Sequence, residues 1–324
     1  MVSINEKMCF APRTTTFNVV IITGVCRSGK TLLARLVGSM SNVEYLDEPW
    51  LQETLPLMPH IGYMDRVAAR HTMVASTQEL MNDSILYRQG NFRPTDLSTV
   101  WNTKHPHEIL HRLVQLQSRD DVVAYIAAHD STLLLVLADT PPFIDFFYEA
   151  FPACKVIHMV RNGFDVATEV AHKQWYATAT LQNPAGNVPY RMFYDTRRKK
   201  DFFIPWWVAA GNEARFLAAS PYAQGLYYWQ QILTINDDVR RKTQKKYSKR
   251  FLSVRYEDLV TNPKHVVAQV ARFMNVATTG RTTELQAAVH KQSGSIKRQS
   301  LSTLCDQTSL NNILSEFNYP LVSR

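Results

Sequence analysis

One segment near the start of the chain carries residue types that bind phosphate. The sequence Gly24-Val-Cys-Arg-Ser-Gly-Lys-Thr31 matches the pattern G-x-x-x-x-G-K-[ST] in full. Its glycines let the backbone turn tightly around an anion, so that consecutive N–H groups and the positive end of the next helix face the ligand. Arg27 and Lys30 supply full charges. A phosphate-like ligand is therefore predicted, the alternative being a glycine turn without a ligand. The predicted binding residues are Gly24, Cys26, Arg27, Ser28, Gly29, Lys30 and Thr31.

Two acidic residues follow short apolar runs elsewhere in the chain. Asp139 ends the run at residues 133–139, which is the pattern of a Walker B magnesium site in ATP-using enzymes. The alternative is a loop acid ahead of two prolines. Glu48 follows the run at residues 43–46, and that geometry can bring its carboxylate back over the mouth of the loop. There it could act as a general base, the alternative being a surface acid at a strand end.

Short apolar runs that alternate with helical patterns must position these residues. The runs are apolar on both faces, as a parallel sheet covered by helices requires. The alternation favours an α/β fold of three layers, with a central parallel sheet flanked by helices around the P-loop. We predict strands at residues 18–23, 43–46, 133–138, 155–160 and 251–255, and helices at residues 30–40, 143–150, 221–240 and 263–274.

The stretch at residues 181–205 interrupts this alternation. It contains Pro184, Pro189 and a run of four basic residues at 197–200. We predict an insertion or a long loop over the sheet. No internal repeat or low-complexity linker is present, so one domain spanning residues 1–324 is the simplest organisation. Residues 175–222 are then the insertion within it.

The composition limits the classes of protein to which this chain can belong. The 324 residues are 45% hydrophobic and 20% charged, which argues against disorder, collagen and coiled coil. The formal charge of +8 suits an anionic ligand without naming one, and we expect no nucleic-acid partner. No signal peptide is visible, and the longest apolar stretch is too short to cross a bilayer. Four cysteines without metal-ligand spacing favour a reducing compartment, so we expect a cytoplasmic location.

Further motifs follow the loop in a specific order. They are Asp-Glu-Pro at residues 47–49, Thr-Pro at residues 140–141, the segment Lys155-Val-Ile-His-Met-Val-Arg161, and Arg-Tyr-Glu-Asp-Leu at residues 255–259. In this order the chain resembles the sulfotransferases that use 3′-phosphoadenosine 5′-phosphosulfate (PAPS). The likeness runs from about residue 18 to residue 273 and is nearer to the bacterial, tyrosylprotein and carbohydrate branches.

The resemblance implies roles for residues on the donor side. Arg27 matches the cation that faces the bridging oxygen, and Lys30 stands where the family usually has Thr. Arg161 matches the arginine that binds the 3′-phosphate, a surface salt bridge being its alternative. The partner serine of that arginine is here Glu169, so the hydroxyl of Thr168 is the candidate replacement.

Further donor contacts are implied by the same resemblance. Tyr256 matches a tyrosine near the adenine, and Lys297 and Arg298 match a basic segment that closes on the 3′-phosphate. A half-buried tyrosine at a strand end and a solvated basic turn are the respective alternatives.

The resemblance also implies how transfer occurs. Glu48 is the expected general base, and Arg27 and Lys30 would neutralise the charge that grows on the leaving phosphate. No metal is expected. The acceptor would be a hydroxyl or amine on a small molecule, carbohydrate or protein. Its expected contacts are Arg88, Arg93 and Trp101, which precede the second long apolar strand.

Two other functions stay open at this point. The lysine of the loop and Asp139 also fit a small-molecule kinase that uses ATP and magnesium. A nucleotide-binding regulatory protein without turnover is the third hypothesis. The motif order makes the sulfotransferase the leading prediction.

Overall fold

The computed structural model describes residues 15–184, 189–289 and 303–322. Its centre is a five-stranded parallel sheet in the order β2-β3-β1-β4-β7. All five predicted strands are present, and the α/β prediction is confirmed. The strands are β1 (Asn18–Gly24), β2 (Val43–Asp47), β3 (Thr132–Ala138), β4 (Lys155–Val160) and β7 (Phe251–Arg255).

Strand β1 lies at the middle of the sheet and brings the phosphate loop to its carboxyl edge. It pairs with β3 from Asn18 opposite Thr132 to Gly24 opposite Ala138, and with β4 on its other side. The chain first crosses from β1 towards β2 and later returns past β1 to reach β4. Ligands of open α/β sheets bind at such a switch point, so the ends of β1, β3 and β4 are where a site is expected.

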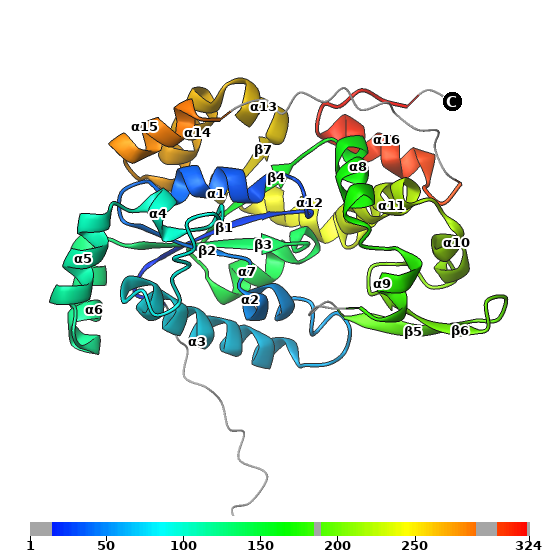
Figure 1. The fold of residues 1–324 in the computed structure, drawn as a ribbon, viewed down its shortest axis with the longest axis horizontal. Coiled ribbons are helices and arrows are strands. Elements are labelled where there is room, and N and C mark those ends of the chain that lie inside the picture. Colours follow the sequence, from blue (N-terminus) through cyan, green and yellow to red (C-terminus); the bar gives the residue numbers. More distant parts are fainter. Residues whose placement is uncertain (1–14, 185–188, 290–302, 323–324) are drawn as a thin grey trace, which may run out of the picture.

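Helices cover both faces of the sheet (Figure 1). The helices α1 (Lys30–Gly38) and α14 (Pro263–Met274) pack on one face, and α3 (Arg66–Ile85) and α7 (Ile144–Ala150) pack on the other. Alternate residues of β1 enter the two layers, so both of its faces are buried. Each fully buried Val, Ile or Leu contributes roughly 1.5–3 kcal/mol, which explains why the apolar runs identify the strands.

A third cluster joins α8 (Gly163–Lys173) to α11 (Pro221–Thr234) beyond the carboxyl ends of β1 and β4. The single helix predicted at residues 221–240 is wrong, because Asn236 has a left-handed backbone with φ 55° and α12 (Asp237–Lys246) begins after it. The remaining helices are α2 (Trp50–Thr54), α4 (Val100–Thr103), α5 (Pro106–Gln115), α6 (Arg119–His129), α9 (Thr178–Gln182), α10 (Glu213–Ala218), α13 (Tyr256–Thr261), α15 (Gly280–Ala287) and α16 (Gln307–Glu316), with short 3-10 turns at Pro141–Phe143 and Ser248–Arg250.

The predicted long loop at residues 181–205 contains regular structure. Strands β5 (Tyr190–Asp195) and β6 (Lys200–Pro205) form an antiparallel hairpin whose turn carries the basic run. Much of β5 is exposed, so its sequence lacks the buried apolar run by which the other strands were found. The hairpin projects from the side of the molecule where α9 and α10 lie (Figure 1).

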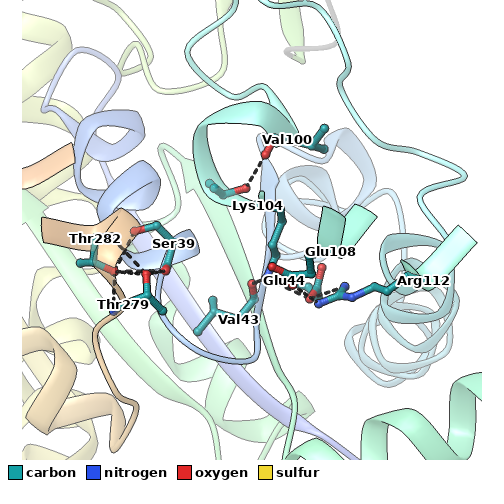
Figure 2. Close-up of polar contacts among 10 residues, drawn as sticks. Ser39, Val43, Glu44, Val100, Lys104, Glu108, Arg112, Thr279 and Thr282 are labelled. Atoms are coloured by element: carbon teal, nitrogen blue, oxygen red, sulfur yellow. Dashed lines mark hydrogen bonds and ion pairs between the residues drawn. The ribbon is translucent and has the colours of Figure 1, made fainter. Parts of the chain in front are cut away.

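A buried ion cluster attaches α5 to the edge strand β2 (Figure 2). Glu44 Oε1 lies 2.8 Å from Arg112 Nη1 and 3.3 Å from Lys104 Nζ. Burial would raise the pKa of Glu44, but the two cations hold it below its ordinary value. Removing one partner would leave an uncompensated buried charge, which is strongly destabilising. The cluster therefore holds the β2 edge in place, and with it the residues that follow β2.

Candidate active site

The backbone of the phosphate loop requires glycine at two positions. Gly29, which caps α1, has φ 94°, and a Cβ there would lie 2.4 Å from the Tyr256 ring. At Gly24 a Cβ would lie 2.3 Å from the Met159 carbonyl oxygen of β4. Gly29 supplies the left-handed turn and allows close packing against Tyr256, and Gly24 allows close packing against β4. The loop therefore curls at the start of α1 as the motif predicts.

Lys30 is buried and directs its ammonium group back into the loop. Its Nζ donates to the Val25 carbonyl oxygen at 3.1 Å and lies 4.0 Å from Glu48 Oε1. Burial would lower the pKa of Lys30, but nearby acidic groups, among them Glu48 and Asp139, hold it above its ordinary value. The ammonium thus stays charged where the loop meets Glu48.

Arg27 of the loop lies beside Arg161, which directly follows β4. Arg161 Nη1 donates to the Arg27 carbonyl oxygen at 3.0 Å, and its guanidinium lies 4.4 Å from the centroid of the Tyr256 ring. Glu169 joins both cations: its carboxylate lies 2.8 Å from Arg27 Nη2 and 3.8 Å from Arg161 Nη2. Three of the predicted donor residues, and the glutamate that replaces the expected serine, thus meet at one place.

The other predicted donor residues have varied positions. The Ser28 hydroxyl is buried and has no hydrogen-bond partner among the described residues, so it is available to a ligand. The Thr168 hydroxyl donates to the Phe164 carbonyl oxygen of its own helix at 3.0 Å. Lys297 and Arg298 lie outside the described residues.

Asp139 ties the loop to helix α11. Its carboxylate accepts hydrogen bonds from the Cys26 N–H at 3.1 Å and from the Tyr228 hydroxyl. Burial raises the pKa of Asp139 above its ordinary value, although these bonds favour its charged form. Burial also raises the pKa of the Cys26 thiol, which favours its neutral form. Asp139 thus acts here as an acceptor for loop and helix donors.

Glu48 lies where β2 ends and the chain turns towards α2. Its backbone N–H donates to the Val136 carbonyl oxygen at 2.9 Å, and its φ of 48° bends the chain directly after the strand. The carboxylate is half-exposed. Non-glycine residues in this backbone region are uncommon and cluster at functional sites. The bend places an accessible carboxylate beside Lys30.

A second carboxylate, Glu53 of α2, lies deeper on the same side. Its Oε1 accepts the Ala138 N–H at 2.5 Å. Burial raises the pKa of Glu53 to about 8, with the charges of Glu48 and Asp139 adding to the effect and Lys30 opposing it. Glu53 can therefore hold a proton at neutral pH.

A pocket of about 310 Å³ opens between the loop, α2 and the base of the hairpin. Aromatic and apolar walls surround the carboxylates, and none of the described residues that line it is Lys or Arg. Such a mixture of apolar surface and a few polar groups is typical of small-molecule sites. The lining residues are Cys26, Glu48, Trp50, Glu53, Thr54, Leu57, Ala138, Asp139, Phe143, Pro189 and Trp206.

The residues predicted to contact the acceptor lie elsewhere. Arg88 lies 3.6 Å from Asp83 in the chain that leaves α3, and Arg93 is exposed in the following loop. Trp101 of α4 donates its indole N–H to the Phe92 carbonyl oxygen at 2.9 Å. None of the three lines the pocket beside Glu48, and their role in binding stays a prediction.

Sequence reasoning missed three residues of this site. Glu53 stands five positions after Glu48, on a helix of only five residues. The sequence there has no helical pattern long enough to predict the position of its side chain. Tyr228 is embedded in the apolar pattern of α11, and its hydroxyl reaches the loop from 202 positions away in sequence. Trp206 lies within the predicted insertion at residues 175–222, but it was not predicted as a site residue. Only the aromatic content of that insertion could have indicated it.

The fold and this site define a class of α/β proteins that bind nucleotide phosphates at a P-loop. A family model described as the sulfotransferase domain matches residues 18–313, and the chain belongs to this family. Solved structures agree in fold at low identity. The sulfotransferase domain of the curacin biosynthetic pathway is 14% identical, with a TM-score of 0.50 over 94% of this chain and 99% of that one. No match was found among curated proteins.

Two further structures have similar coverage. The sulfotransferase domain of the olefin synthase of Synechococcus PCC 7002 is 17% identical, with a TM-score of 0.49 over 98% of this chain and 100% of that one. Sulfotransferase STF9 from Mycobacterium avium is 12% identical, with a TM-score of 0.46 over 96% of this chain and 79% of that one.

Family membership decides between the functions that the sequence left open. The protein is a PAPS-dependent sulfotransferase. The kinase interpretation of Lys30 and Asp139 is wrong, as is that of a regulatory protein without turnover. The described residues contain no group of three His, Cys, Asp or Glu side chains that could hold a metal ion. In the same residues, no helix has both the length and the apolar character needed to cross a membrane.

Proposed function

We propose that this sulfotransferase transfers the sulfuryl group of PAPS to a hydroxyl or amine held in the pocket of Glu53 and Trp206, with Glu48 as general base. One observation carries the proposal: the Lys30 ammonium lies 4.0 Å from the Glu48 carboxylate, at the junction of the phosphate loop and the pocket. A cation for the leaving phosphate and a base for the attacking atom thus lie at one point.

The residues of the loop fit the donor. The buried Ser28 hydroxyl without a partner and the loop N–H groups are donors for the 5′-phosphate. Tyr256 lies against Gly29 and under the Arg161 guanidinium, where an aromatic face can support the nucleotide. Arg161, with Arg27 beside it, supplies charge for the second phosphate. PAPS, when bound, provides an activated sulfur whose leaving group is that 5′-phosphate.

Transfer then needs a proton acceptor and a neutralised leaving group. As the acceptor oxygen or nitrogen bonds to sulfur, the bond from sulfur to the phosphate oxygen breaks. The proton of the acceptor passes to Glu48, which is accessible from the pocket. Lys30 and Arg27 stabilise the negative charge that grows on the phosphate. The products are a sulfated acceptor and 3′-phosphoadenosine 5′-phosphate (PAP).

The pocket indicates the size of the acceptor and the segment that contacts it. Its volume of about 310 Å³ accommodates a small molecule or the end of a larger one. Pro189 and Trp206, at the two ends of the hairpin, form one wall of it. Residues 175–222 are therefore proposed as the segment that selects the acceptor, within a single domain.

Sulfur-labelled PAPS and a panel of hydroxyl and amine acceptors test this proposal. Wild-type protein should yield a labelled product together with PAP. Glu48→Gln should lower kcat about 10²- to 10⁴-fold, because the proton loses its acceptor, while the affinity for PAP stays within about twofold. Asp47→Asn is the matched control and should retain most activity. A reversed result, with Asp47→Asn inactive and Glu48→Gln active, would refute Glu48 as the base.

We also propose a cytoplasmic location. Cys26, Cys154 and Cys305 are free thiols, and Cys154 is buried. Free cysteines of this kind are usual in reducing compartments. Fractionation of cells that express the chain, followed by detection in the soluble cytosolic fraction, tests it.

A further inference from the structure

Glu169 forms a bridge between two cations at the donor site. It lies in the middle of α8, and its carboxylate oxygens lie 2.8 Å from Arg27 Nη2 and 3.8 Å from Arg161 Nη2. Arg27 belongs to the loop, and Arg161 donates a hydrogen bond to the loop backbone. The carboxylate therefore occupies a position where two guanidinium groups converge on one anion.

The donor brings its own anion to this flank. PAPS carries one phosphate at each end of its ribose, and the loop takes the 5′ end. A second phosphate beside the loop needs further positive charge, and the guanidinium groups of Arg27 and Arg161 converge there. The Glu169 carboxylate would stand within a few ångströms of that phosphate, where like charges repel strongly. The two anions compete for the same cations.

We infer that Glu169 is a displaceable substitute for the 3′-phosphate: it holds the two arginines while the donor is absent, and the 3′-phosphate takes its place on binding. Glu169 therefore lowers the affinity for nucleotides that carry this phosphate. The inference rests on PAPS as donor and not on the proposed base or acceptor.

The structure allows the exchange without disturbing Arg161. Its guanidinium is held by the Arg27 carbonyl oxygen and by the Tyr256 ring, and neither contact involves Glu169. The Glu169 side chain is 25% exposed, so it can rotate outward into solvent.

Calorimetric titration of the full chain with PAP and with AMP tests the inference, because AMP lacks the 3′-phosphate. Glu169→Gln and Glu169→Ser should each bind PAP about tenfold more tightly than wild type, since the competing charge is gone. Affinity for AMP should change less than about twofold. Glu284→Gln, which removes an exposed carboxylate from the Arg281 pair on α15, controls for net charge and should change neither affinity.

Three results would overturn the inference. Weaker binding of PAP to both Glu169 variants would mean that the carboxylate positions the arginines for the phosphate. An equal gain for AMP and PAP would remove the link to the 3′-phosphate. Unchanged affinity for PAP would show that the two anions do not compete. Labelled transfer to an acceptor is measured separately, so failure of Glu48 as base would leave this test intact.

Discussion

The two sides of Lys30 differ in charge. On the donor side, Arg27 and Arg161 face a single carboxylate, Glu169. On the acceptor side, Glu48, Glu53 and Asp139 line the pocket, and no Lys or Arg is found among its described lining residues. Burial raises the pKa of both Glu53 and Asp139 on that side. Lys30 thus lies between a cationic side, where the phosphates of the donor are proposed to bind, and an acidic side, where the acceptor is proposed to bind.

Removing a cation from the donor side should have the largest effect on binding. Arg161→Met should weaken PAP binding about 100-fold, because charge-assisted hydrogen bonds to phosphate are lost. The acceptor KM should stay nearly constant at saturating PAPS. Arg255→Met is the matched control, since Arg255 also packs on a tyrosine ring, that of Tyr319 at 4.5 Å. An equal loss of PAP affinity in both variants would mean that the loss does not come from the phosphate contact of Arg161. The donor side would then not be defined by its cations.

Neutralising Glu53 should change how stability depends on pH. The folded protein holds this proton up to about pH 8, whereas an unfolded glutamate loses it near pH 4.3. Between these values the folded state binds more protons at this group, so the contribution of Glu53 to stability falls as pH rises from 5 to 8. Glu53→Gln should remove that fall of about 3–4 kcal/mol, measured by urea unfolding at both pH values. Glu79→Gln, an exposed carboxylate paired with Arg119, should keep the wild-type slope.

The smallest effect is expected for the apolar wall of the acceptor side. Trp206 packs against Phe143 at 5.7 Å and against His60 at 5.9 Å between ring centroids. Trp206→Ala should raise the acceptor KM about tenfold through lost contact area and leave PAP affinity unchanged. Trp101→Ala tests the alternative that the acceptor lies near α4. If Trp101→Ala raised KM and Trp206→Ala did not, the acceptor side would have to be reassigned.

Sequence patterns predicted the donor side better than the acceptor side. The loop motif joins consecutive residues, and the runs that became β1 and β4 are apolar on both faces, so the loop and both strands were predicted from the residues. The resemblance implied a donor role for Arg161, and the structure places it beside the loop. That a carboxylate would bridge the two arginines did not follow, because it depends on the side-chain positions of α8.

The acceptor side depends on contacts between distant segments. Tyr228 reaches Asp139 from α11, and Glu53 reaches the end of β3 from a helix of five residues. The exposed strand β5 carries no buried pattern, so a hairpin was predicted as a loop. Arg88, Arg93 and Trp101 were predicted from their place in the chain, which does not determine which pocket a loop enters.

The bond from Tyr228 has a consequence for the hairpin side of the molecule. The Tyr228 hydroxyl meets both Asp139 and the Cys26 N–H, while the neighbouring Tyr227 hydroxyl accepts from Asn212 Nδ2 at 3.1 Å, just before α10. One turn of α11 therefore contacts both the nucleotide loop and the segment that is proposed to wall the acceptor pocket. We expect a substitution in this turn to change donor affinity and acceptor choice together.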